Sequence, residues 1–270
     1  MAFNSIAQNQ IMSNKFKVTI LGSGTSQGVP VIACDCHVCS SQETKDQRLR
    51  ASILISWHGH NFVIDTGPDF RQQILNSKIK SLRALLYTHE HKDHLAGMDD
   101  VRAFNHREER DMEIFCTSRV ADALKREYNY VFSGERYPGI PTVNINLIEN
   151  RSFRLPDGPI VTPIEVLHYK MPVFGYRIGD FTYITDAKTI SIEERDKVRG
   201  TKVLIVNALH RSKHISHFNL AEALEFIEDI QPEIAYLTHI SHLFGTHEEI
   251  LVSLPPNVFV AYDGLELEVE

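Results

Sequence analysis

The hydrophobic residues of the chain fall into short runs, several of which are apolar throughout and are bounded by polar or glycine-rich segments. Such runs are typical of β-strands, and runs that lack alternation are typical of strands buried on both faces. A Gly-rich turn follows the first run, and His58-Gly59 separates the second and third as a hairpin. This pattern predicts strands over residues 17–21, 52–56, 61–65, 84–88, 113–116, 160–167, 175–178, 181–185, 203–207, 234–238 and 258–262.

Other stretches place apolar residues three and four positions apart, as in residues 220–227 behind Asn219, a plausible helix cap. This spacing predicts helices over residues 68–77, 118–128, 191–198 and 219–230. Residues 1–15 are expected to be a frayed polar tail, and residues 128–141 a long irregular loop. Short strands that alternate with helices predict one layered α/β domain over residues 16–270, with helices outside the sheets.

Composition narrows the classes of protein that fit. The 270 residues include 43% hydrophobic ones, enough for a sizeable core, and no run approaches the ~18 residues of a membrane span. The net charge of −7 argues against an extended nucleic-acid surface, although a metal ion could still attract a small anionic substrate. Residues 1–10 do not have the pattern of a signal peptide, so we expect a cytoplasmic protein whose cysteines are thiols or metal ligands.

The chain has fourteen histidines, and three of them lie in a short segment after a buried strand, Thr88-His89-Glu90-His91-Lys92-Asp93-His94. Alternation in an extended segment directs His89 and His91 toward one ion, while Asp93 and His94 can reach a second ion ~3.5–4 Å away. Imidazole with carboxylate suits zinc, iron or manganese. Two coordination spheres need further ligands, and each remaining candidate ends a predicted strand: His168, Asp186 and His239.

Three cysteines lie within six residues, at Cys34, Cys36 and Cys39. In a cytoplasmic protein this spacing predicts three ligands of a tetrahedral structural zinc. The residues alone leave the fourth ligand open among His37, Cys116 and a distant histidine. Cys116 ends an apolar strand, which favours a place in the core.

The histidine motif after an apolar strand, with later His, Asp and His residues each ending a strand, resembles the metallo-β-lactamase fold over residues 17–264. The resemblance implies an αββα sandwich with two metals. His89, His91 and His168 would hold one metal, Asp93, His94 and His239 the other, and Asp186 would bridge them. Asp65 resembles the aspartate of this family that orients a ligand histidine by accepting its second N–H.

Gly28-Val-Pro, the cysteine triplet and the histidine motif together resemble the phosphoribosyl 1,2-cyclic phosphate phosphodiesterase (PhnP) subfamily. The resemblance implies that His242, three residues after His239, is the fourth ligand of the structural zinc. It also implies that His217 contacts the phosphate and protonates the leaving oxygen. We infer that this zinc clips the N-terminal loop to the loop that presents His239.

These expectations describe a metal-dependent phosphodiesterase for a small cyclic or nucleotide-type phosphodiester. A hydroxide shared by two divalent ions, zinc or manganese, would attack phosphorus in line. Asp93 and His217 are the candidate catalytic residues. Arg102 and Arg136 are candidate substrate contacts, with a surface ion pair as the alternative for Arg102 and packing at a dimer interface as the alternative for the loop of Arg136.

Two other functions fit the same sequence. One is an RNA- or DNA-end nuclease of the same fold, but the basic, Gly-rich arm of tRNA 3′-processing endonucleases does not occur here. The other is a non-catalytic, metal-dependent carrier or binding protein, against which the intact set of candidate ligands argues. The subfamily tends to dimerise, so a homodimer is a candidate assembly.

Overall fold

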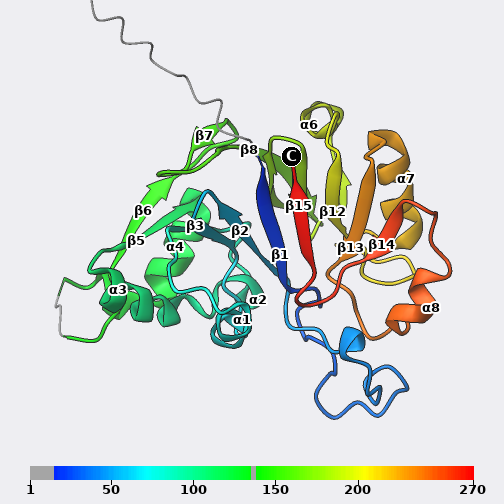
Figure 1. The fold of residues 1–270 in the computed structure, drawn as a ribbon, viewed down its shortest axis with the longest axis horizontal. Coiled ribbons are helices and arrows are strands. Elements are labelled where there is room, and N and C mark those ends of the chain that lie inside the picture. Colours follow the sequence, from blue (N-terminus) through cyan, green and yellow to red (C-terminus); the bar gives the residue numbers. More distant parts are fainter. Residues whose placement is uncertain (1–14, 135–137) are drawn as a thin grey trace, which may run out of the picture.

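The computed structural model describes residues 15–134 and 138–270, and in it two β-sheets pack face to face with helices on both outer sides (Figure 1). This is the αββα sandwich that the sequence predicts, in a single domain. Residues 1–14 of the expected tail lie outside the described residues, as does Arg136. The boundary of the tail therefore stays a prediction.

The first sheet joins the beginning and the end of the chain, because its first strand pairs with its last one in antiparallel fashion. Its order is β15 (Glu266–Val269), β1 (Phe16–Gly22), β2 (Ser52–Trp57), β3 (His60–Ile64), β4 (Ala84–Leu86), β5 (Met112–Cys116) and β6 (Val143–Leu147). The helices on its outer side are α1 (Phe70–Ser77), α2 (Lys92–Leu95), α3 (Arg102–Glu108), α4 (Ser118–Glu127) and α5 (Asn129–Phe132), together with the 3-10 helix η2 (Met98–Val101).

The second sheet has an antiparallel half and a parallel half. Its order is β11 (Thr189–Ile190), β8 (Ile160–His168), β9 (Met171–Ile178), β10 (Phe181–Ile184), β12 (Val203–Asn207), β13 (Ile234–Thr238) and β14 (Val258–Val260), with β7 (Phe153–Arg154) paired to β8. Its outer helices are α6 (Ile192–Val198), α7 (Leu220–Ile230) and α8 (His247–Leu251). Asn219 caps α7 through a reciprocal pair of hydrogen bonds with Glu222.

Three clusters of buried side chains hold the four layers together. The central cluster lies between the sheets and contains Ile20 and Phe62 from the first sheet and Tyr176 and Phe181 from the second. A second cluster joins the first sheet to its helices, and a third joins the other sheet to α6, α7 and α8. Because both faces of each sheet are covered, the central strands are apolar throughout, which is why the sequence predicted them well.

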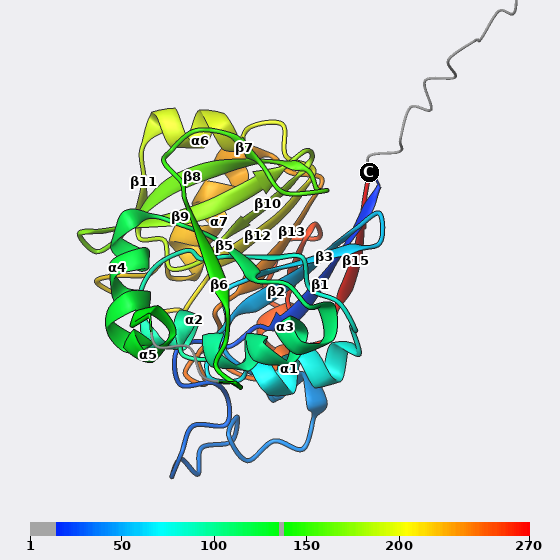
Figure 2. The ribbon, with the colours of Figure 1, turned by 90° about the vertical axis from the view of Figure 1, so that its left-hand side faces the viewer.

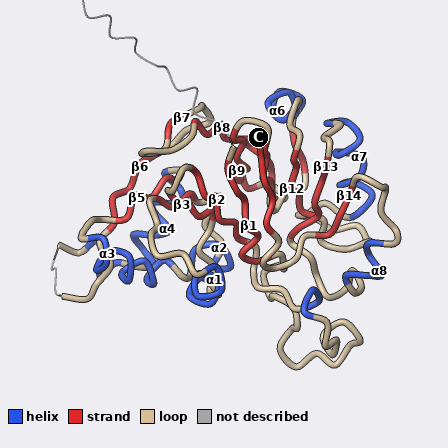
Figure 3. The backbone as a smooth tube through the Cα atoms, in the orientation of Figure 1, coloured by secondary structure: helices blue, strands red, loops and turns tan. Residues whose placement is uncertain are grey.

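The loops determine where polar side chains can gather. Residues 23–51, between β1 and β2, run as a long segment below the sheets (Figure 1, blue) and contain the 3-10 helix η1 (Thr44–Asp46). Figure 3 shows further loops around this lower edge, below β12 and β13. The segment 128–141, expected to be irregular, contains α5, and the Tyr128 hydroxyl donates to the carbonyl of Leu95 in α2. That part of the segment packs against the histidine motif and is not a free loop.

Candidate active site

Buried histidines and aspartates gather where strands of both sheets end. The histidine motif follows β4, His168 ends β8, and Asp186 follows β10. His239 follows β13, and His217 lies in the loop between β12 and α7. The carboxyl ends of strands are the usual place for sites in α/β proteins. The structure thus brings the sequence-predicted candidates of four strands to one edge of the sandwich.

Asp186 lies at the centre of this cluster. His94 Nε2 is 3.2 Å from one of its carboxylate oxygens, and His239 Nε2 is 3.3 Å from the other. Asp93 Oδ2 lies 3.1 Å from His94 Nε2, so Asp93, His94 and His239 have ligand atoms close enough to share one ion. This is the set that the resemblance implied for one of the two metals.

The other expected set is assembled less tightly: among the described residues, no close group of ligand atoms contains His89, His91 and His168 together. The ring centroid of His91 is 4.7 Å from that of His89 and 5.2 Å from that of His168. His89 also groups with His94 and Asp186, and His168 with Asp186 and His217. Asp186 therefore belongs to one group that contains His94 and to another that contains His168. It thus links the two expected ligand sets, as a bridging position requires.

A buried carboxylate sets the tautomers of two of these histidines. His94 Nδ1–H donates to Asp65 Oδ2 at 2.7 Å, which leaves its Nε2 with a free lone pair. Thr88 donates both its backbone N–H and its hydroxyl to Asp65, so the hydroxyl oxygen accepts from His89 Nδ1–H at 2.9 Å. A chain of hydrogen bonds from His89 through Thr88 to Asp65 thus leaves His89 Nε2 free as well.

The free imidazole nitrogens fit a divalent metal. Among the described residues, the buried Nε2 atoms of His89, His94 and His239 have no hydrogen-bond partner, an arrangement that costs free energy unless something else binds them. Burial lowers the pKa of His89 and keeps it neutral, as a metal ligand must be. Burial raises the pKa of Asp93, but His94 and His239 together lower the pKa overall.

The backbone is held in an unusual conformation at several of these positions. Asp65, Asp186 and His239 have φ angles of 65°, 57° and 59°, in the left-handed region that non-glycine residues seldom adopt. Such residues cost about 1–3 kcal/mol each and are found where the surrounding structure holds them for a function. All three face the candidate metal positions, either directly or through His94.

His217 lies between Asp186 and a second histidine. Its Nε2 is 2.9 Å from Asp186 Oδ1, and its Nδ1 is 3.1 Å from His214 Nδ1 and 3.0 Å from the Ser216 hydroxyl. Burial lowers the pKa of His217 to about 4, against the opposing effect of Asp186. From the sequence, His210 and His214 were equal candidates for lining the pocket, with a solvated position as the alternative, because spacing alone did not distinguish them; the structure places His214 beside His217.

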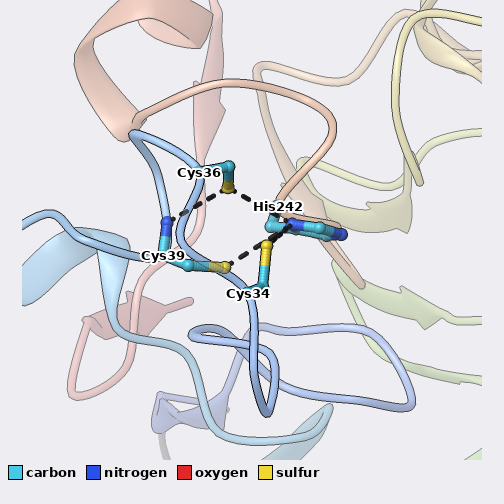
Figure 4. Close-up of side chains that lie close together, drawn as sticks. All are labelled: Cys34, Cys36, Cys39 and His242. Carbon is cyan, nitrogen blue, oxygen red and sulfur yellow. Dashed lines mark hydrogen bonds between the residues drawn. The ribbon is translucent and has the colours of Figure 1, made fainter.

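A second cluster joins the long loop after β1 to the loop after β13 (Figure 4). His242 Nδ1 lies 3.4 Å from Sγ of Cys34 and of Cys36, and 3.5 Å from Sγ of Cys39. The pKa of the Cys36 thiol is lowered to about 6, mainly by a hydrogen bond from the backbone N–H of Cys39 and next by the contact with His242. A lowered pKa favours the thiolate, which is the form that binds metal. Three sulfurs and one imidazole suit a closed tetrahedral zinc site.

The other candidates for the fourth zinc ligand lie elsewhere. His37 Nε2 is 3.2 Å from a carboxylate oxygen of Glu249. Cys116 is buried in the cluster between the first sheet and its helices, as its place in an apolar strand predicted. The geometry therefore leaves His242 as the partner of the three thiols.

Residues 60–240 match the sequence pattern of the Beta-lactamase superfamily domain, which is more than half of the chain. The chain belongs to the metallo-β-lactamase superfamily. A crystal structure described as a new diphosphatase from the PhnP family superposes with a TM-score of 0.88 at 35% identity, covering 94% of this chain and 97% of that one. Zinc-bound PqqB from Methylobacterium extorquens superposes with a TM-score of 0.76 at 19% identity, over 93% and 99%.

A relative by sequence is the octanoyltransferase of Porphyromonas gingivalis (strain ATCC BAA-308 / W83), 38% identical over 255 residues. The match covers 93% of this chain but 51% of that protein, so this chain spans about half of the relative's length. By sequence family and by fold, this metallo-β-lactamase-superfamily protein resembles the PhnP family.

Two candidate substrate contacts remain. Arg102 pairs with Asp99 at 3.2 Å on the surface of α3, which is the alternative that sequence reasoning had named for it. Arg136 lies outside the described residues. Within residues 15–134 and 138–270, no helix combines the length and the apolar character needed to span a bilayer.

Proposed function

We propose that this protein is a metal-dependent phosphodiesterase that cleaves small cyclic or nucleotide-type phosphodiesters with two divalent metals, zinc or manganese. The observation that carries the proposal is the convergence of free imidazole nitrogens and carboxylate oxygens on both sides of Asp186. The likeness to a diphosphatase of the PhnP family supports a P–O bond as the target. The structural zinc site and the homodimer implied by the resemblance belong to the same proposal.

Each proposed metal takes its ligands from one side of Asp186. One set is His89, His91 and His168, and the other is Asp93, His94 and His239, with Asp186 shared. Metals bound there would offset the charge of the phosphate and lower the pKa of water to near neutrality. Asp65 and Thr88 hold the ligand histidines in the tautomer that leaves Nε2 free.

His217 is proposed to protonate the leaving oxygen. Its Nε2–H points at Asp186 in the centre of the site, and Ser216 and His214 lie within hydrogen-bond distance of Nδ1. Because burial keeps His217 neutral, loss of the Nε2 proton to the leaving oxygen would be matched in the same step by uptake of a proton at Nδ1, beside Ser216 and His214. General acid catalysis of this kind typically contributes 10²–10⁴-fold in rate.

The decisive experiment measures hydrolysis of bis(p-nitrophenyl) phosphate by metal-analysed protein, with and without added manganese. Turnover together with about three metals per chain supports the proposal, because two catalytic ions and one structural zinc account for that number. Full metal content without turnover on any phosphodiester contradicts it and favours the carrier function.

Two histidine variants separate the roles. We expect His91→Ala to abolish activity and to lower the metal content, because a ligand is lost. We expect His217→Ala to lower kcat by 10²–10⁴-fold while the metal content stays at the wild-type value. A full metal complement with nearly unchanged kcat in His217→Ala would rule out the acid assignment and leave the metal site standing.

A further inference from the structure

A cavity of about 480 Å³ opens directly beside the candidate metal site. It borders His91 and His168 and is otherwise lined by residues without an assigned role, among them Arg119, Tyr169, Lys170 and Ile215. Figure 2 shows α4, which carries Arg119, on the same side of the molecule as the turn between β8 and β9, which carries Tyr169 and Lys170. The volume lies in the range of roughly 300–1,000 Å³ that is usual for small-molecule sites.

Two cations give the cavity a positive wall in an acidic protein. Arg119 Nε donates to Glu90 of the histidine motif, an ion pair that anchors the guanidinium, offsets part of its charge and leaves its terminal amino groups for a ligand. Lys170 Nζ lies 5.3 Å from the centre of the Tyr169 ring and has no carboxylate partner in the part of the chain that the structure describes. No Asp or Glu lines this cavity, although the net charge is −7. An anionic group beyond the scissile phosphate would therefore be attracted here.

Two large side chains at the same cavity are exposed to solvent and are not packed in the core. Tyr169 is 52% exposed and Ile215 is 66% exposed. Tyr169 also has a φ of 58°, which asparagine or glycine would adopt at lower cost, so the turn itself does not call for an aromatic residue. A flat base could stack on the tyrosine ring, and such stacking tolerates any base because each has a π-face.

We propose that this cavity is a nucleotide subsite, in which Tyr169 and Ile215 hold a base while Arg119 and Lys170 hold a second phosphate. This inference rests on the proposed function and narrows it, because it assigns the substrate to the nucleoside phosphate esters and not to bare sugar phosphates. His91 and His168 border the cavity, so the scissile phosphate of a nucleotide bound there would lie at the candidate metal site.

Equilibrium binding tests the subsite without relying on turnover. Isothermal titration of the full, metal-loaded chain compares ADP with ribose 5-phosphate, which lacks the base and the second phosphate. We expect ADP to bind at least 10-fold more tightly. Tyr169→Asn, which suits the left-handed backbone, should remove about 10-fold of the ADP affinity, and Tyr169→Phe should retain it.

A matched control and a charge variant complete the test. Ile192, an exposed residue at the start of α6 outside the cavity, provides the control Ile192→Ser, which should bind ADP as the wild type does. Lys170→Gln should weaken ADP binding more than adenosine binding, because only ADP has phosphates. Equal affinity for ADP and ribose 5-phosphate, or equal effects of Tyr169→Asn and Ile192→Ser, would overturn the proposal.

The phosphodiesterase activity and the nucleotide subsite can be contradicted separately. If ADP binds with the expected pattern but no phosphodiester is hydrolysed, the phosphodiesterase is wrong and the nucleotide subsite stands. If bis(p-nitrophenyl) phosphate is hydrolysed but ADP has no advantage over ribose 5-phosphate, the subsite is wrong and the phosphodiesterase stands.

Discussion

Asp65 has no contact with any proposed substrate position, yet it sets the direction of two ligand histidines. It accepts from His94 directly and from His89 through the hydroxyl of Thr88. Burial raises the pKa of its carboxyl, so the three donor atoms around it, two of Thr88 and one of His94, must offset the cost of its charge. An aspartate in this place keeps both histidines correctly oriented before any metal arrives.

We expect Asp65→Asn to lower metal affinity and kcat/KM by 10–100-fold, because the amide can present an N–H where a histidine now donates. Metal content after dialysis and turnover of bis(p-nitrophenyl) phosphate measure the effect. Asp157→Asn is the control, since it removes an exposed ion pair with Arg83 outside the site. Wild-type metal retention in Asp65→Asn would show that the histidines need no such support.

Single residues were predicted from sequence only where the chain order itself signals them. His89, His91, Asp93 and His94 share one short segment, and His168, Asp186 and His239 each follow an apolar run. Thr88, by contrast, is recognisable only from the two hydrogen bonds that the fold gives its hydroxyl. Arg119, Tyr169 and Ile215 come from three distant segments, so no pattern along the chain could place them around one cavity.

At the scale of elements, the loop after β13 connects the two clusters. It carries His239 toward Asp186 and His242 toward the three thiols, with Ile240 and Ser241 between them. Backbone hydrogen bonds tie this loop to the Gly-rich segment after β1, from Thr25 N–H to the Ile240 carbonyl and from Ile240 N–H to the Ser23 carbonyl. A change at the cysteine cluster can therefore reach His239 through a short, well-connected stretch of backbone.

We expect Cys36→Ser to release the structural metal and also to lower activity by at least 10-fold, because His242 loses its partner and the loop of His239 loosens. Metal analysis and turnover are measured on the same samples. His37→Ala is the matched control from the same loop, because His37 pairs with Glu249 and faces away from the thiols. If only the structural metal were lost and turnover were unchanged, the two sites would be independent.

Elements were predicted from sequence where both faces are buried and missed where one face is exposed. The central strands β2, β4 and β12 are apolar runs, whereas β6 reads Val-Asn-Ile-Asn-Leu and β15 reads Glu-Leu-Glu-Val at the two edges of the first sheet. Alternating polar residues are compatible with an edge strand but equally with a loop, so the sequence alone did not identify these strands. The short helices α2, α5 and α8 were missed because four or five residues carry too little periodicity.

At the scale of the whole molecule, a buried polar group joins the start, the loops and the end of the chain. Asp263, near the C-terminus, accepts from the backbone and the hydroxyl of Ser23 and from the N–H of Leu49. The buried Arg48 donates to the Ser23 hydroxyl and to the carbonyl of Ala261. Burial raises the pKa of Asp263 to about 6, so its ionised form is disfavoured in the folded protein.

Because the pKa of Asp263 is raised, its ionisation lowers the unfolding free energy as the pH rises. A neutral residue at this position removes that loss. Between the unfolded pKa near 3.9 and the folded pKa of about 6, the folded state binds more protons, so the contribution of Asp263 to stability falls as the pH rises. Two pKa units correspond to about 3 kcal/mol. From pH 4 to pH 7 we expect Asp263→Asn to gain roughly 2–3 kcal/mol of unfolding free energy relative to the wild type.

Urea unfolding of both proteins in the same metal-loaded state gives the measurement. Glu266→Gln is the control, because Glu266 is exposed and pairs with Lys17 on the surface. The difference between this control and the wild type should change little across the same pH range. A constant difference between Asp263→Asn and the wild type would show that Asp263 is ionised throughout.

The pairing of β1 with β15 has a consequence for synthesis on the ribosome. β1 emerges well before β15, which pairs with it and forms one edge of the same sheet. His239 and His242 also emerge late, so a nascent chain released before residue 239 lacks a ligand of each cluster at once. Metal loading of either proposed centre would therefore be a late event of translation, and a chain terminated before residue 239 could assemble neither proposed centre in full.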